Sequence, residues 1–125
     1  MENDTPNKKI VRGFLEAVTQ GKFNEAYENY VDMGGKHHNV YYASDFATLR
    51  KGMEENHAQF PDKEFDIKMV VEEKDRVITF SNVRFGGKNI SVMHAFRIDL
   101  GKIVEMWDCA QIIPTDSPNK EGAFF

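Results

Sequence analysis

Hydrophobic residues in the first half of the chain recur at helical spacing in three segments. The first spans residues 5–20, because a threonine hydroxyl followed by proline is a typical helix start and Gly21 suits a helix end. The second spans residues 22–31, and the third begins after Ser44 and ends at Phe60-Pro61. The positions on these stripes are Ile10, Val11, Phe14, Leu15, Val18, Phe23, Ala26, Tyr27, Tyr30, Phe46, Leu49, Met53 and His57. The pattern predicts three helices, and the first two form a hairpin.

The second half of the chain is rich in β-branched and aromatic residues and predicts four strands. The strands cover residues 65–73, 77–85, 90–99 and 103–113, and the turns between them are short, which favours an antiparallel meander. A further short strand is expected at residues 36–42, after Gly34-Gly35 interrupts the preceding pattern. The tail over residues 114–125 contains Pro114, Pro118 and Gly122 and is expected to be irregular.

Helices followed by a strongly curved antiparallel sheet predict an α+β fold, in which three N-terminal helices cover one face of the sheet. A sheet that wraps around helices in this cone-shaped way leaves a cavity. The chain has 125 residues, of which 41% are hydrophobic and 29% charged, which is ordinary for one globular unit. We therefore expect a single domain over residues 1–125.

Charge and cysteine content exclude several classes of partner. The formal net charge is -4 and the charges are interspersed, so no nucleic-acid partner is expected. No apolar stretch approaches the roughly 18–20 residues that span a bilayer, and the first residues lack a signal-peptide pattern, so no membrane partner is expected. Cys109 is the single cysteine, which excludes an internal disulfide and fits a reducing compartment, with the cytoplasm as the expected location.

The last two predicted strands carry the residues that are most informative about function. If Gly101 takes the left-handed bulge position of a three-residue hairpin loop, Ile98 pairs with Lys102. His94 and Asp108 then share a face that is otherwise almost entirely apolar. A two-residue loop would separate this pair and mix polar residues into the apolar set, so we reject that register.

A carboxylate and an imidazole on an apolar concave surface have a chemical consequence. Desolvation raises the pKa of an acid and lowers that of a histidine, so both groups move toward neutrality. Chemistry at a carbon next to a carbonyl needs a group that takes a proton and a second group that stabilises the enolate oxygen. Asp108 suits the first role and His94 the second, and the two are expected to be hydrogen-bond partners. A satisfied polar contact within the core is the alternative, and spacing alone fits both interpretations.

The segment over residues 96–108 contains a Phe-Arg pair, then Gly-Lys-Ile, then Glu-x-Trp-Asp. This run resembles the signature of SnoaL-like proteins, a branch of the nuclear-transport-factor-2-like superfamily. The resemblance extends to the opening helix, to the His38-Asn39 pair and to residues 119–125, and so covers most of the chain. It implies the same α+β fold, with a curved sheet wrapped around the helices.

The resemblance also implies roles for individual residues. In the polyketide cyclases of that family, an aspartate on the last strand acts as acid/base in an intramolecular aldol condensation, beside a histidine of the preceding strand. The matching residues are Asp108 and His94, and no cofactor is implied. Two departures concern the substrate: Met106 stands where many relatives carry histidine, and Val40 stands where many carry proline.

The walls of the expected cavity come from both halves of the chain. His38 is expected to be a hydrogen-bond donor in the wall, and the apolar and aromatic wall residues are expected to be Phe14, Tyr42, Val92, Phe96 and Met106. Trp107 points to the opposite face, where a homodimer contact is expected. A metal site is not expected, because adjacent strand residues His37 and His38 point to opposite sides and no carboxylate pair accompanies them.

Three functions are consistent with the sequence. The first is a SnoaL-like enzyme that performs cyclase- or isomerase-type acid–base chemistry on a small hydrophobic substrate with a carbonyl group. The second is a non-catalytic protein that binds a small hydrophobic molecule in the same cavity. The third is a dimeric interaction module whose cavity has no present function. Ligand-dependent stabilisation separates the third from the others, and turnover separates the first two.

Overall fold

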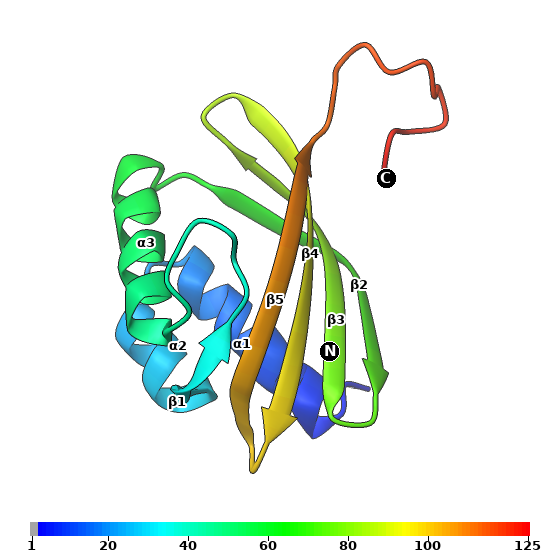
Figure 1. Ribbon diagram of the computed structural model, residues 1–125. Coiled ribbons are helices and arrows are strands. Elements are labelled where there is room, and N and C mark those ends of the chain that lie inside the picture. Colours follow the sequence, from blue (N-terminus) through cyan, green and yellow to red (C-terminus); the bar gives the residue numbers. More distant parts are fainter. Residues whose placement is uncertain (1–2) are drawn as a thin grey trace.

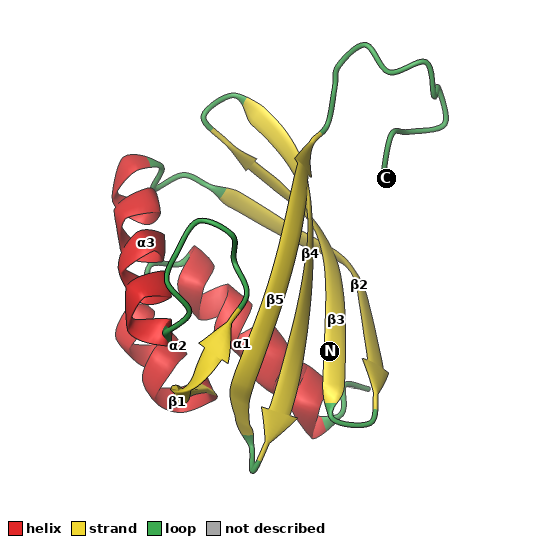
Figure 2. Ribbon diagram, in the orientation of Figure 1, coloured by secondary structure: helices red, strands yellow, loops and turns green. Residues whose placement is uncertain are grey.

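Three helices lie against one face of a five-stranded curved sheet in the computed structural model, which describes residues 3–125 (Figure 1). Met1 and Glu2, which belong to the expected domain, lie outside the described residues. Figure 2 shows α1 running behind the long strands, with α2 and α3 to the left of them. The elements in chain order are α1 (Pro6–Thr19), α2 (Phe23–Tyr30), β1 (Val31–His37), α3 (Phe46–Gln59), β2 (Glu64–Glu73), β3 (Arg76–Phe85), β4 (Lys88–Asp99) and β5 (Lys102–Ile112).

The helix-start signals act through side-chain oxygens that accept backbone hydrogen bonds. The Thr5 hydroxyl accepts from the Lys8 N–H at 3.3 Å, and Gly21 follows the first helix with φ at +76°, so both predicted ends of α1 are confirmed. The predicted cap of α3 is wrong by one residue. Asp45, and not Ser44, caps α3, because its carboxylate accepts from the Thr48 N–H at 2.8 Å.

The early strand differs from its prediction. It was expected at residues 36–42 after a break at Gly34-Gly35, but β1 runs from Val31 to His37 and includes both glycines. The physical reason is a close approach of two backbones: a Cβ at Gly35 would lie 2.1 Å from the Val104 carbonyl oxygen of β5. Gly35 therefore permits strand pairing here instead of interrupting it.

Gly35→Ala is expected to destabilise the fold by about 1–3 kcal/mol, because the Val104 carbonyl oxygen belongs to the backbone and can move only if β5 moves. Gly34→Ala is the matched control. A Cβ there meets only the Asp32 carboxylate, at 3.3 Å, and that side chain can turn away. Urea unfolding of both variants measures the difference, and equal stability of the two would contradict the packing at Gly35.

The sheet has the strand order β1-β5-β4-β3-β2. The predicted antiparallel meander is confirmed for β2 to β5, and the strand bounds agree with the sequence pattern within two residues. The sheet is not wholly antiparallel, because β1 pairs with β5 in the parallel direction at the edge. The parallel pair brings the end of β1, and the loop that follows it, to the middle of β5.

The predicted register of the last hairpin is wrong in detail. The loop has two residues, Leu100 and Gly101, both with positive φ, so Asp99 pairs with Lys102 and Ile98 with Ile103. An irregularity between Arg97 and Ile98 then shifts the pairing by one residue. With the two-residue loop alone, His94 and Asp108 would lie on opposite faces of the sheet. The shift returns them to the same face. His94 and Asp108 are therefore directly opposite each other, and the prediction that they share a face is confirmed.

The closed part of the core lies toward the β4–β5 turn. Phe14 of α1 packs edge-on against Tyr27 of α2 at 5.5 Å between ring centres, and against Phe96 of β4 at 6.1 Å. Phe96 and Met106 are 0% and 1% exposed, so these two predicted wall residues belong to the packed core. Farther along β4 and β5 a cavity lies against the inner face of the sheet, and the candidate site is there.

Candidate active site

A cavity of about 290 Å³ lies between the helices and the inner face of β3, β4 and β5. This volume is near the lower end of the range for small-molecule sites, about 300–1,000 Å³. Five of the predicted site residues are among those that line it: Phe14, Tyr42, Val92, His94 and Asp108. Most other wall residues are apolar, so a hydrophobic ligand there would bury apolar surface against them.

His94 and Asp108 form the middle of a polar row across the sheet. His94 pairs with Thr79 of β3 on one side and with Asp108 of β5 on the other. His94 is 8% exposed and stacks on Phe96, with ring centres 5.6 Å apart. Burial lowers the pKa of the His94 imidazole to about 4, and the nearby Asp108 carboxylate opposes that shift. The imidazole is therefore neutral near pH 7, so it carries one N–H donor and one nitrogen acceptor.

Asn39 holds the Asp108 carboxylate from the loop after β1. Its amide nitrogen donates to both carboxylate oxygens, at 3.0 Å each. Its own side-chain oxygen accepts from the Tyr41 N–H at 2.9 Å, and its backbone N–H donates to His37 Nδ1 at 3.0 Å. Because Nδ1 accepts, the proton of the His37 ring is on Nε2, which donates to the Ala43 carbonyl oxygen at 2.6 Å. These bonds fix the loop and thereby the position of the Asn39 amide.

Sequence reasoning did not assign Asn39 to the site. The His38-Asn39 pair was noted, but the donor role was given to His38. Asp108 and His94 were expected to be hydrogen-bond partners, yet the carboxylate accepts from Asn39, and the His94 Nδ1 is buried without a partner among residues 3–125. The loop conformation after β1 decides which of the two neighbouring side chains faces the cavity, and the residue pattern does not encode it.

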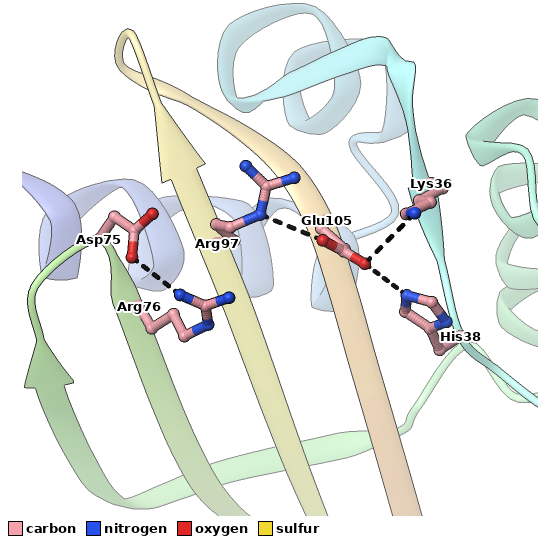
Figure 3. Close-up of polar contacts among 6 residues, drawn as sticks. All are labelled: Lys36, His38, Asp75, Arg76, Arg97 and Glu105. Atoms are coloured by element: carbon pink, nitrogen blue, oxygen red, sulfur yellow. Dashed lines mark hydrogen bonds and ion pairs between the residues drawn. The ribbon is translucent and has the colours of Figure 1, made fainter.

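His38 lies on the other face of the sheet (Figure 3). Its Nε2 is 2.6 Å from Glu105 Oε2, and its ring stacks on Trp107 at 5.1 Å between centres. Glu105 also accepts from Arg97 at 3.1 Å and lies 3.9 Å from Lys36 Nζ. Three basic side chains thus surround one carboxylate on the outer face, and hydrogen bonds from His38 and Arg97 lower the pKa of Glu105. His38 is therefore not a wall residue of the cavity.

Two further polar side chains face inward beside the site. Thr79 and Ser81 of β3 are both 0% exposed, and their hydroxyl oxygens have no hydrogen-bond partner among residues 3–125. Thr79 is the cross-strand neighbour of His94, and Ser81 that of Val92. Buried hydroxyl groups without partners are uncommon, because each costs free energy. The inner face of the sheet is therefore more polar around His94 than the sequence pattern indicated.

The family of the chain follows from a match to a family model. The model of the SnoaL-like domain matches residues 11–106, which is most of the chain. The chain belongs to the SnoaL-like domain family. The matched range includes His94 and Asn39, and Asp108 lies just beyond its end.

Solved structures of other proteins resemble this SnoaL-like domain along most of its length. A loop-truncation variant of IdmH, a protein of Streptomyces antibioticus, has a TM-score of 0.73 and 19% identity, and the match covers 84% of this chain and 92% of that one. A SnoaL-like polyketide cyclase from Agrobacterium tumefaciens has a TM-score of 0.72 and 14% identity, with 86% and 93% covered. An NTF2-like protein of unknown function from Burkholderia xenovorans has a TM-score of 0.75 and 14% identity, with 91% and 88% covered.

At these identities the structural matches establish the fold of the SnoaL-like domain and leave its reaction open. Among curated proteins, nothing matches the chain. Over residues 3–125, no helix has both the length and the apolar character needed to cross a membrane. The chemistry must therefore be argued from the cavity and its polar groups.

Proposed function

We propose that this SnoaL-like domain catalyses acid–base chemistry at the carbon next to a carbonyl group of a small hydrophobic substrate, as in an aldol cyclisation or an isomerisation. The proposal depends chiefly on one observation: the cross-strand pair of His94 and Asp108 in the wall of an apolar cavity. The polyketide cyclase among the structural neighbours supports the same class of reaction.

In this mechanism Asp108 and His94 have complementary roles. The Asp108 carboxylate takes a proton from the carbon next to the carbonyl group, and the electron pair of the broken C–H bond moves to the carbonyl oxygen. The neutral imidazole of His94 donates an N–H hydrogen bond to that oxygen as its negative charge develops. The Asp108 carboxyl group then returns the proton to the product, so the enzyme ends unchanged. Asn39 is a positioning residue that orients the carboxylate.

A second candidate function is binding without catalysis. The observation that favours it is the Asn39 amide, which donates to both oxygens of Asp108, so that both oxygens already have a hydrogen-bond partner within the protein. In that case the cavity would hold a small hydrophobic molecule whose polar group meets His94. The two candidates share the ligand class and differ in whether a proton is removed from the ligand.

Deuterium exchange at the carbon next to a ketone separates these candidates, because it isolates the first proton transfer and needs no knowledge of the full substrate. The protein is incubated in heavy water with α-tetralone, a compact aromatic ketone, and loss of the α-proton signal is followed by NMR. We expect exchange faster than in buffer alone. Ligand-dependent stabilisation without faster exchange would favour the binding protein and would contradict the catalytic proposal.

We further propose that the protein works in the cytoplasm, where the exposed Cys109 remains a thiol. We also propose that the outer face of the sheet forms a homodimer contact. Four large apolar side chains on that face support the contact, because each is 45% exposed or more: Met69, Val71, Ile78 and Met93. Exposed apolar patches of this kind mark association sites. Sedimentation equilibrium of the full chain should give twice the monomer mass.

A further inference from the structure

Lys63 lies at the end of the cavity that is remote from Asp108. It belongs to the segment between α3 and β2 and is the only lysine or arginine among the described residues that line this cavity. Its ammonium group is 4.6 Å from the centre of the Phe85 ring, which lines the same end of the cavity. An ammonium over an aromatic ring is held in place, yet the ring does not neutralise its charge.

The hydrogen-bond partner of Lys63 is neutral. Its ammonium donates to the side-chain oxygen of Asn56, and over residues 3–125 no carboxylate lies within ion-pair distance of it. Two lysines on the sheet differ in this respect: Lys36 lies near Glu105, and Lys68 near Asp66. An ammonium group has three N–H donors, so Lys63 has capacity for further acceptors. Partial burial lowers the pKa of this amine, which agrees with a charge that lacks compensation.

The two polar ends of the cavity are separated along the sheet. His94 pairs with Thr79 on β3, and Phe85 lies six positions farther along the same strand. Six residues of a strand span about 20 Å along the chain. Between these ends the wall is formed by apolar side chains, among them Val83, Val92 and Ala110. A negative charge beside Lys63 is therefore separated from the Asp108 carboxylate by these apolar side chains.

From this arrangement we infer that the ligand of the cavity is an elongated hydrophobic carboxylate, whose anionic group binds Lys63 while its apolar part extends toward His94 and Asp108. A charge-assisted hydrogen bond from the ammonium would compensate the charge that the protein leaves unpaired. The inference deepens the proposed function, because it names the class of ligand. It rests on the proposed function only in placing the reacting part of the ligand beside Asp108.

Calorimetric titration with octanoate and octanamide tests the inference, because the two molecules share one chain and differ in charge. We expect the wild-type protein to bind octanoate about tenfold more tightly than octanamide near neutral pH. Lys63→Met is expected to remove this preference while octanamide still binds, which shows that the cavity is intact. Lys63→Arg should retain the preference. Lys88→Met is the matched control, since Lys88 is exposed near the β3–β4 turn and does not line the cavity.

Equal affinity of the wild-type protein for both molecules would overturn the inference. So would a preference for octanoate that Lys63→Met leaves unchanged. Both readouts are binding constants, and they do not involve proton transfer at Asp108. If the protein shows no preference for octanoate but accelerates exchange in the ketone, the Lys63 site is contradicted and the proposed reaction is supported. If it prefers octanoate but does not accelerate exchange, the proposed reaction is contradicted and the Lys63 site is supported.

Discussion

Asp108→Asn is expected to lower the rate of α-proton exchange in α-tetralone by about 100-fold to 10,000-fold, the usual contribution of a general base. Asparagine has the shape of aspartate but does not accept the proton. The Asn39 amide can still donate to the remaining oxygen of residue 108, so the loop after β1 keeps one of its anchoring hydrogen bonds. The measurement is the exchange rate by NMR at equal concentrations of folded protein.

The matched control for this variant is Asp99→Asn, which removes the same charge from an exposed position next to the β4–β5 turn. Exchange by this control should equal that of the wild-type protein. If Asp108→Asn also kept the wild-type rate, Asp108 would have no part in the proton transfer, and the proposed reaction would lose its base.

The unfolding free energy of the wild-type protein is expected to fall by about 3 kcal/mol more than that of a His94→Gln variant when the pH is lowered from 7 to 4. Burial lowers the folded-state pKa of His94 to about 4, below the ordinary histidine value of 6.5. Between these values the unfolded chain binds a proton at His94 and the folded protein does not. Acid therefore favours the unfolded state, and the stabilisation is fully present only above about pH 6.5.

Urea unfolding at a series of pH values measures this effect in both proteins. The difference between them isolates His94, because the other three histidines and the carboxyl groups titrate in both. The comparison concerns the change with pH and not the absolute stability, which the substitution itself alters. Parallel curves for wild type and His94→Gln would contradict the buried, neutral imidazole.

The sequence predicted most of the secondary structure because each helix and strand carries its own local signal. Thr5 and Pro6 mark the start of α1, and β-branched residues mark the four long strands. The same reasoning failed at β1, where Gly34 and Gly35 were taken as an interruption. The reason for the second glycine, Gly35, is a close approach to Val104, about 70 positions later in the chain, and local periodicity does not contain that information.

The shared face of His94 and Asp108 was predicted through an incorrect loop. The hairpin has the two-residue turn that was rejected, and an irregularity beside Ile98 restores the alternation. Apolar patterning fixes which residues face the core, whereas it does not fix where the extra residue of a bulge lies. The outcome at the site was therefore predictable, and the pairing of individual residues was not.

The loop side of the site was the least predictable part. Residues 38–45 have no regular structure, so no periodicity assigns Asn39 to the cavity and His38 to the outer face. Their positions depend on hydrogen bonds to Asp108 and Glu105, which lie in β5. Lys63 was missed for the same reason, since it lies outside the helices and strands that carry the hydrophobic pattern.

The central claim is that the ligand enters the cavity beside His94, and the four histidines of the chain provide a direct test of it. Imidazole nitrogen signals of the wild-type protein are recorded by NMR while α-tetralone is added. The account predicts that the signals of His94 shift and that those of His38, on the outer face, do not. Shifts at His38 with no change at His94 would contradict it.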